Sequence, residues 1–264
     1  MLRLGWFSTG RGEGSRGLFS RVQEDILSGN IDAKIEFVFC NREQGEYEGS
    51  DRFIELVESY SVPIITYSFK HFYNDYGIRI SENRSAFDKE IMERIRPFKP
   101  DICVLAGYML ITGAELCEQY NMINIHPALP DGPIGTWQQI IWKLIHNRDR
   151  ETGAVVFHVT RDLDEGPRIT YCSFPIHGEE YQTAWKQIDN RSIIELQKEH
   201  GESLPLFQLI REAGIKREQP LLTQTLAAFS KGKIKFKSGK LVDKKDKPLI
   251  PLCFSSEVEA SLSY

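Results

Sequence analysis

The sequence has few cysteines, no long apolar run and no excess of basic residues, and each absence excludes a class of protein. The five cysteines are scattered without a Cys-x-x-Cys pair, which argues against a disulfide framework and against a structural zinc site. No apolar run approaches the roughly 20 residues that a membrane-spanning helix needs. The net charge of −4 argues against a general nucleic-acid binder, which usually carries a basic surface.

The N-terminus lacks the apolar core of a secretory signal peptide, because residues 1–7 are strand-like and too few. Together with the unpaired thiols, this absence predicts a cytoplasmic protein. The 264 residues are 41% hydrophobic and 27% charged, which is typical of a globular protein with one large domain, or one domain with a small appendage.

Strand-like and helical patterns alternate along the first half of the chain. Short apolar runs predict five strands, at residues 3–8, 34–40, 62–67, 101–106 and 122–125. Helical spacing of apolar residues predicts helices at 18–27, 51–60, 84–95 and 112–118, and residues 68–82 are predicted to be irregular. The alternation predicts an α/β fold, a doubly wound, mostly parallel sheet of the Rossmann-like kind.

In the second half of the chain, the sequence pattern predicts four helices, two further strands of the sheet and a hairpin. The strands are expected at 153–160 and 168–176, the helices at 137–147, 183–200, 206–213 and 220–231, and a hairpin at 233–243. We therefore expect a core at residues 1–177, a helical insertion within the same domain at 178–217, and a C-terminal helix and hairpin at 218–264 that complete the domain.

Asn124 and His126 stand at the end of the fifth predicted strand. Residues i and i+2 of a strand point to the same side, so both side chains are expected to project together. Pro127 restricts His126 to an extended conformation. Ligands of parallel α/β sheets bind outside the carboxyl ends of the strands, which makes this pair a candidate site. An amide can stabilise an oxyanion and an imidazole can move protons, as acyl transfer requires.

A glycine-rich segment, residues 9–17, follows the first predicted strand. Its spacing differs from the dinucleotide-binding fingerprint, and no Walker lysine follows it. A strand, glycines and the start of a helix nevertheless form a suitable phosphate cradle, because free backbone N–H groups and the helix dipole favour an anion. Ser15 and Arg16 would add donors. The alternative is a flexible connection.

Two other features have simpler explanations when they are considered alone. Asp164 lies in the predicted tight turn at 162–167, where aspartate is common for local hydrogen bonding. The lysine-rich stretch at 231–247 has few aromatic residues for stacking on bases, so nucleic-acid contact is not expected there. Its alternating lysines are better explained as protection of an exposed hairpin edge.

Taken together, these motifs resemble those of the folate-dependent formyltransferases, and most closely those of the phosphoribosylglycinamide formyltransferases. The resemblance is carried by residues 124–130 with Gly135, by residues 152–160, and by the Asp-Leu-Asp-Glu-Gly-Pro turn at 162–167. Residues 105–109 and 12–15 add to it. The similarity covers residues 1–176 and resumes at 220–241.

The resemblance implies transfer of a formyl group from 10-formyltetrahydrofolate to a primary amine, without a metal. Glycinamide ribonucleotide in purine biosynthesis is the favoured acceptor, and a homodimer is one possible assembly. The implied catalytic residues are Asn124, His126 and Asp164. The implied donor-binding residues are Tyr108, Met109, Leu110, Thr160, Asp162 and Leu163. The implied residues for the acceptor, a small and phosphorylated amine, are Gly12, Gly14, Ser15, Arg16 and Pro127.

The sequence departs from the pattern of this family at several positions. Arg16 replaces an asparagine of the phosphate loop, Leu110 replaces an arginine, and Phe157 replaces a histidine. The glutamate that binds the acceptor in the family has no clear counterpart, although Glu212 and Glu218 are candidates. These differences leave the acceptor open, for example to an amino sugar nucleotide.

Three other functions are weaker alternatives. Formylation of methionyl-tRNA is disfavoured because no large basic C-terminal domain follows. Hydrolases of 10-formyltetrahydrofolate share the turn at 162–167, but they carry an N-terminal regulatory domain, whereas the fold here is expected to begin at residue 3. A nucleotide-binding module without activity would not need Asn124, His126 and Asp164 together.

Overall fold

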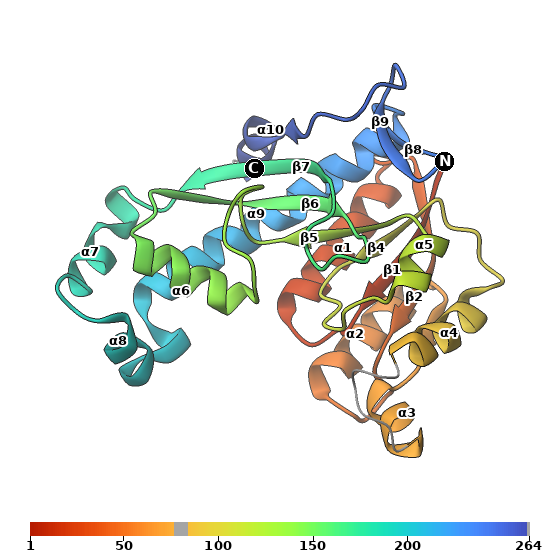
Figure 1. Cartoon of the computed structure of the whole chain (residues 1–264), viewed down its shortest axis with the longest axis horizontal. Coiled ribbons are helices and arrows are strands. Elements are labelled where there is room, and N and C mark those ends of the chain that lie inside the picture. The colour runs from red at the N-terminus through yellow and green to blue at the C-terminus, as the bar shows by residue number, and fades with distance from the viewer. Residues whose placement is uncertain (77–83, 263–264) are drawn as a thin grey trace. The chain divides into compact units, whose positions relative to one another are not determined.

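The computed structural model describes residues 1–76 and 84–262 and shows an α/β fold (Figure 1). An eight-stranded, mostly parallel sheet has the strand order β10-β7-β6-β5-β4-β1-β2-β3. Its strands are β1 (Leu2–Ser8), β2 (Ala33–Cys40), β3 (Ile64–Thr66), β4 (Ile102–Leu105), β5 (Met122–His126), β6 (Glu151–His158), β7 (Arg168–Pro175) and β10 (Leu252–Cys253). A separate hairpin pairs β8 (Ile234–Lys237) with β9 (Lys240–Asp243). The predicted fold class is confirmed.

Helices connect most of these strands. They are α1 (Glu13–Leu27), α2 (Glu48–Ser59), α3 (Phe69–Tyr76), α4 (Arg84–Ile95), α5 (Ala114–Gln119), α6 (Trp137–Asn147), α7 (Glu179–Gln187), α8 (Ile193–Glu199), α9 (Pro205–Ser230) and α10 (Ser255–Leu262), with a 3-10 turn at Gly201–Ser203. None of the described helices is long and apolar enough to cross a membrane.

The chain divides into two compact units, each assembled from three segments. Unit 1 comprises Met1–Asn124, Phe157–Pro167 and Thr225–Ile250. Unit 2 comprises Ile125–Val156, Arg168–Gln224 and Pro251–Tyr264.

The centre of unit 1 is β1, whose alternating side chains build two apolar layers. Trp6 points to one face and meets Phe19 of α1, with ring centroids 5.7 Å apart, and Phe19 in turn meets Phe53 of α2. The neighbouring residues of β1 point to the opposite face. There Gly5 leaves room for the ring of Phe37, which a Cβ atom at residue 5 would meet at 2.6 Å. Both faces of the strand are buried, as expected for a central parallel strand.

The second face of this sheet is covered by α3, α4 and α5. Phe87, Ile91 and Ile95 of α4 are 0–1% exposed and belong to one apolar cluster with Phe72 of α3 and Leu116 of α5. The helical spacing of the α4 residues explains why this helix was predicted with the correct bounds.

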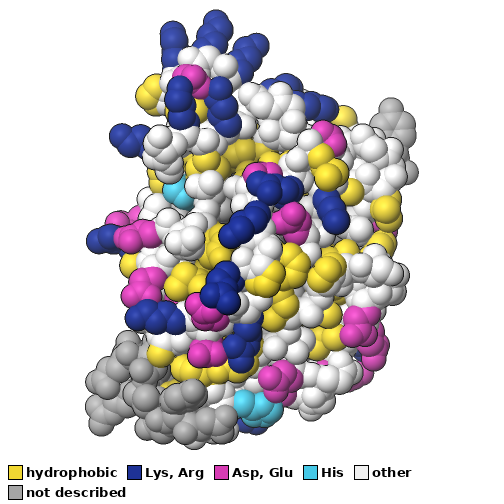
Figure 2. All heavy atoms as spheres, turned by 90° about the vertical axis from the view of Figure 1, so that its right-hand side faces the viewer, with side chains coloured by type: hydrophobic (Ala, Val, Ile, Leu, Met, Phe, Trp, Pro, Cys, Tyr) yellow, Lys and Arg dark blue, Asp and Glu magenta, His cyan; other side chains and the backbone are white. Residues whose placement is uncertain are grey.

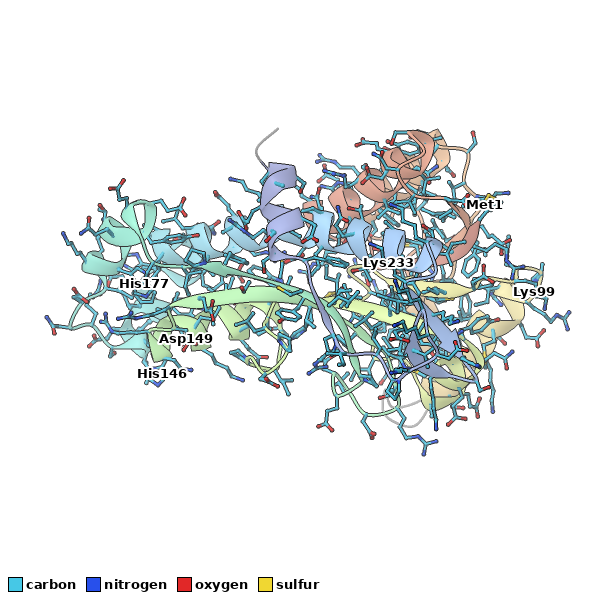
Figure 3. The ribbon with its side chains drawn as sticks, turned by 90° about the horizontal axis from the view of Figure 1, so that it is seen from above. Met1, Lys99, His146, Asp149, His177 and Lys233 are labelled. Atoms are coloured by element: carbon cyan, nitrogen blue, oxygen red, sulfur yellow. The ribbon has the colours of Figure 1, made fainter. Side chains whose placement is uncertain are left out.

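Unit 2 is built around α6, which begins with a capping box between Thr136 and Gln139. The helices of the expected insertion pack into the same apolar cluster as α6, through residues such as Tyr181 and Leu196. Trp185 of α7 donates its Nε1–H to the carbonyl oxygen of Ile176 at 2.7 Å. Its ring stacks on His177, which is labelled in Figure 3, with centroids 4.5 Å apart. The insertion is therefore part of the core of this unit.

Five predicted elements differ from the structure, and strand β10 and helix α10 were not predicted. Helix α1 begins at residue 13 instead of 18, because Gly14 and Gly17 are tolerated within it. Residues 69–76 of the segment predicted as irregular form α3, and 77–82 lie outside the described residues. The helix predicted at 183–200 is divided into α7 and α8, since Ser192 and Glu195 form a capping box that starts a new helix. The helices predicted at 206–213 and 220–231 are one helix, α9.

Pro220 lies inside α9 although proline normally ends a helix. The ring removes one backbone hydrogen bond, but Leu221, Leu222 and Leu226 beside it are completely buried. Burial of these side chains outweighs the loss and keeps the helix continuous.

A buried ion pair in α9 gives the first prediction. Nη1 of Arg211 lies 3.0 Å from Oε1 of Glu218, and the two side chains are 19% and 10% exposed. Arg211→Ala should lower the free energy of unfolding in urea by about 3 kcal/mol, because it leaves a mostly buried carboxylate without its partner. The control Arg96→Ala removes an exposed pair with Glu93 and should cost less than about 1 kcal/mol. Equal losses in the two variants would contradict a stabilising role for the buried pair.

Candidate active site

Strand β5 carries Asn124 and His126 at the end where the prediction placed them. Asn124 is the register partner of Leu105 in β4, which is parallel to β5. Both side chains are half-buried. Positions i and i+2 of a strand share a side, so the amide and the imidazole project from the same side of β5. Asn124 ends the first segment of unit 1, whereas His126 and Pro127 belong to unit 2.

Thr9 ties together the carboxyl ends of three strands in unit 1. Its backbone N–H donates to the carbonyl oxygen of Gly107 after β4, at 3.0 Å. Its hydroxyl donates to Oδ1 of Asn41 after β2, at 2.8 Å, and accepts from the N–H of Met109, at 2.9 Å. Ser50 of α2 donates to the carbonyl oxygen of Thr9. Since Thr9 is only 3% exposed, this network fixes the loops that surround it.

The predicted phosphate loop is partly helical in the structure. Gly12 is the N-cap of α1 and makes no side-chain cap, so Gly14 and Ser15 lie in the first turn of the helix. Their backbone N–H groups lack partners within the helix, as at any helix start, and the dipole adds positive potential there. The backbone of this segment can therefore hold an anion.

The side chains of Ser15 and Arg16 make contacts within unit 1. Ser15 is 8% exposed, and its hydroxyl occupies the space that a Cβ atom at Gly107 would fill. Gly107 has φ of 68°, which also favours glycine. Nη1 of Arg16 donates to the carbonyl oxygen of Gly49 at 3.2 Å. The guanidinium of Arg16 thus helps to hold α2.

Arg11 and Arg42 flank an exposed tyrosine beside the start of α1, and sequence reasoning missed them. The guanidinium carbon of Arg11 lies 5.7 Å from the ring centre of Tyr47, and that of Arg42 lies 5.0 Å from it. Neither guanidinium forms an ion pair with a carboxylate in the described part of the chain. Two forked cations without a counter-ion suit a phosphate. The sequence contains one signal for them, which is that each arginine follows the end of a predicted strand by two or three residues.

Of the predicted donor-binding residues after β4, one packs into the core and two are exposed or half-buried. The ring of Tyr108 packs edge-to-face on Phe7, with centroids 5.8 Å apart, and is therefore partly a core residue. Met109 is 57% exposed and Leu110 is half-buried. Leu163, from the predicted catalytic turn, is 54% exposed. Such exposed apolar side chains are suited to contact a flat apolar ligand.

The turn that carries Asp164 is fixed by its own backbone. Asp164 is half-buried and has φ of 58°, a left-handed conformation that aspartate tolerates better than most residues. Gly166 is pressed against the carbonyl oxygen of His158, where no Cβ atom would fit. The hydroxyl of Thr160 donates to the carbonyl oxygen of Asp162 at 3.3 Å. These contacts hold the turn that carries the carboxylate.

Cys117 of α5 connects the two segments predicted to bind the donor. Its Sγ lies 3.3 Å from the hydroxyl of Thr112 and 3.8 Å from the carbonyl oxygen of Thr160. This half-buried thiol was not singled out in the sequence, because nothing in its neighbourhood marks it.

A pocket of about 520 Å³ opens beside this turn in unit 1. It is lined by Cys117, Glu118, Asn121, residues 158–162, residues 165–167 and Gly239 of the β8–β9 hairpin. Thr160 and Asp162 are the predicted donor-binding residues that line it. Among the described residues, no group of three or more His, Cys, Asp or Glu side chains is placed to hold a metal ion.

A larger pocket, of about 890 Å³, lies in unit 2 beyond Pro127. Its lining includes residues 129–133, which follow the His126-Pro127 pair, and Asp149, which is labelled in Figure 3. Two glutamates were considered for acceptor binding. Glu218 forms an ion pair with Arg211, whereas Glu212 is exposed.

The fold is that of an α/β protein with polar side chains after several of its strand ends. Residues 12–191 match the family model described as formyl transferase, which is more than half of the chain. The protein therefore belongs to the formyl transferase family, whose members use formyl-tetrahydrofolate donors. The predicted membership is confirmed.

Known relatives support the same assignment. The chain is 26% identical over 171 residues to the phosphoribosylglycinamide formyltransferase of Bacillus subtilis, which covers 64% of this chain and 77% of the relative. The structure of the Coxiella burnetii phosphoribosylglycinamide formyltransferase matches with a TM-score of 0.67 and 19% identity, over 96% of this chain and 98% of that one. A formyltetrahydrofolate deformylase from Pseudomonas syringae matches with a TM-score of 0.64 and 19% identity, over 92% and 65%. At this identity the two structures show the fold alone.

His158, in the lining of the smaller pocket, gives a pH prediction. Its ring meets Phe236 with centroids 4.9 Å apart, and burial lowers the pKa of the imidazole below its ordinary value of 6.5. The unfolded chain therefore binds this proton more readily. The free energy of unfolding should fall as the pH drops from about 6.5 through the lower pKa of the folded state.

Urea unfolding between pH 8 and pH 5 measures this effect. His158→Gln should show a shallower loss of stability at low pH than the unsubstituted protein. The control His146→Gln, at an exposed histidine of α6, should leave the pH dependence unchanged. An unchanged pH dependence in His158→Gln would contradict the assignment.

Proposed function

We propose that this protein transfers a formyl group from 10-formyltetrahydrofolate to the primary amine of glycinamide ribonucleotide. The observation that carries the proposal is the pair Asn124 and His126 on one side of the end of β5, inside the segment that matches the formyl transferase family. The similarity to the Bacillus subtilis enzyme supports the choice of acceptor. The free thiols of the chain are compatible with a cytoplasmic enzyme.

The reaction forms one C–N bond, breaks another, and moves one proton. The amine nitrogen attacks the formyl carbon, the bond from this carbon to N10 of the folate breaks, and one proton passes from the amine to N10. The amide N–H of Asn124 would stabilise the negative oxygen of the tetrahedral intermediate. His126 would assist as imidazolium or proton carrier, and Asp164 would hold a water or the imidazole and help to remove the amine proton.

The anion site at the start of α1 supports a phosphorylated acceptor. The backbone N–H groups of Gly14 and Ser15 offer a cradle, and Arg11 and Arg42 supply two positive charges beside it. We propose that this site holds the phosphate of the acceptor, with Gly12 leaving open space above it. Pro127 would line the acceptor site next to His126.

The exposed apolar residues support a folate donor. Met109 and Leu163 would contact the flat ring system of the donor, together with Leu110. Tyr108 would support this surface from the core, and the turn residues Thr160 and Asp162 would close it.

A second candidate is hydrolysis of 10-formyltetrahydrofolate, in which water replaces the amine. It is favoured by the similarity of the fold to the Pseudomonas syringae deformylase. The purified protein should be incubated with 10-formyltetrahydrofolate, with and without glycinamide ribonucleotide, while release of tetrahydrofolate is followed. Release that requires the amine supports transfer, and release without it supports hydrolysis. Activity only with another phosphorylated amine would show that glycinamide ribonucleotide is not the acceptor.

The catalytic assignment predicts losses of turnover. Asn124→Ala, His126→Ala and Asp164→Asn should each lower kcat by about 100-fold or more, because each removes a group that acts only in the transition state. Near-normal kcat in all three would refute the assigned roles. Unchanged thermal unfolding of the variants would exclude misfolding as the cause.

The phosphate assignment predicts a different kinetic effect. Arg42→Ala and Arg11→Ala should each raise KM for the phosphorylated acceptor by roughly 10-fold and leave kcat nearly unchanged, because they hold a group that does not react. Inorganic phosphate should also inhibit these variants less than the unsubstituted protein. Arg96→Ala is the matched control, since this arginine is exposed and lies on α4's C-terminal side. An unchanged KM in both variants would show that these arginines do not bind the phosphate of the acceptor.

A further inference from the structure

Arg11 and Arg42 differ from most arginines of unit 1, because neither is paired with a carboxylate in the described part of the chain. Figure 2 shows acidic and basic side chains lying next to one another over much of the face in view. Six arginines of this unit form ion pairs: Arg3, Arg21, Arg52, Arg94, Arg96 and Arg161. The two arginines without a carboxylate partner therefore need an explanation.

Acidic residues are abundant beside Arg42. Residues 42–52, which follow β2 and enter α2, contain two arginines and four carboxylates, a formal charge of −2. Glu43 directly follows Arg42, and Glu46 lies four residues beyond it. Carboxylates that paired with Arg42 would neutralise its charge and repel an anion. A phosphate site in this loop therefore requires the carboxylates to be held by other partners.

Two of the four carboxylates are bound within the segment itself. Glu48 pairs with Arg52 one turn along α2. Oδ1 of Asp51 accepts the backbone N–H of Gly45 at 2.8 Å. These two contacts need no other part of the protein.

The other two carboxylates are bound by Ser68, which directly precedes α3. The hydroxyl of Ser68 donates to Oε1 of Glu46 at 2.7 Å, and its backbone N–H donates to Oε1 of Glu43 at 3.3 Å. Ser68 is 0% exposed and the side chain of Glu46 is 11% exposed, so water competes little for the first contact. Nδ1 of His71 in α3 lies 2.9 Å from Oε2 of Glu43. The start of α3 thus engages both carboxylates, and neither pairs with Arg42.

The backbone on both sides of Arg42 is fixed by the same segment. The carbonyl oxygen of Asn41 accepts the backbone N–H of Phe69, the first residue of α3, at 3.2 Å. On the other side, Ser68 holds the carboxylate of Glu43. The start of α3 therefore determines both where Arg42 lies and which carboxylates can reach it.

We propose that Ser68 is a positioning residue of the anion site, because it holds Glu43 and Glu46 away from Arg42. The inference rests on the proposed function, since it takes the guanidinium of Arg42 to bind the phosphate of the acceptor. Ser68 acts through the two carboxylates and not by contact with the phosphate. Without it, they would pair with Arg42 and compete with the phosphate for the same N–H groups.

Calorimetric titration of the full-length protein with inorganic phosphate at low ionic strength tests the proposal. Ser68→Ala should weaken phosphate binding about fivefold, because the released carboxylate of Glu46 adds one solvent-screened negative charge beside Arg42. The double variant Ser68→Ala, Glu46→Gln should recover the affinity of the unsubstituted protein, because a neutral amide does not compete with phosphate. The hydroxyl of Ser68 also accepts the N–H of His71 and caps α3, but both variants lose this cap. Recovery therefore reports the charge alone.

Two further variants make the test independent of folding. The control Ser192→Ala removes the matching N-cap of α8 in unit 2 and should leave phosphate binding unchanged. His71→Ala changes an exposed residue and releases Glu43 without touching Ser68. It should weaken phosphate binding about twofold, since the pair is exposed, and Glu43→Gln in the same chain should reverse the loss.

The outcomes separate this inference from the proposed function. Weaker phosphate binding in Arg42→Ala, with unchanged binding in Ser68→Ala and His71→Ala, would overturn the inference and leave the phosphate site in place. A loss in Ser68→Ala that Glu46→Gln does not reverse would also overturn it, because the role of Ser68 would then be structural alone. Recovery in the double variant would support the inference even if the protein transfers no formyl group to glycinamide ribonucleotide. Phosphate binding that is absent, or unchanged in Arg42→Ala, would overturn both the inference and the phosphate assignment.

Discussion

The candidate site depends on one buried threonine. Thr9 uses its N–H, its hydroxyl and its carbonyl oxygen to bind residues after β4, residues after β2 and the side chain of Ser50 in α2. Parallel strands share hydrogen bonds only along their length, so the loops beyond their ends need other partners. Thr9 provides hydrogen-bond partners for the loops after both β2 and β4. The position of Met109, the start of α1 and the arginines beside it all follow from this junction.

The candidate site residues of unit 1 combine close backbone contacts with exposed side chains. Gly107 against Ser15 and Gly166 against His158 allow two close backbone contacts that no larger residue would permit. Met109 and Leu163 remain exposed in spite of their apolar surface. Two exposed apolar side chains that flank polar strand ends are suited to contact an apolar part of a ligand.

The sequence predicted the elements whose signal is local. Strands β1 to β7 of the sheet and helix α4 were predicted, because an apolar run or a regular apolar stripe needs no knowledge of distant residues. The two-residue edge strand β10 was not predicted, since so short a run carries no such signal. The predicted start of α1 was wrong because Gly14 and Gly17 lie inside the helix. The predicted break in α9 was wrong because the burial of Leu221 and Leu222, which keeps the helix continuous past Pro220, cannot be seen in the sequence. The positions of Asn124 and His126 followed from strand geometry. Arg11 and Arg42 each follow a strand end in the sequence, but their meeting at Tyr47 depends on how two separate loops are folded, which the sequence pattern did not show.

The division of the chain into units has a consequence for its synthesis. The polypeptide passes from one unit to the other five times, and each unit takes its last segment from beyond residue 224. Neither unit can therefore be completed on the ribosome before residues beyond 224 have emerged. The N-terminal β-α repeats must wait, partly folded, for residues 225–250, so folding is expected to finish as one late event instead of in two successive steps.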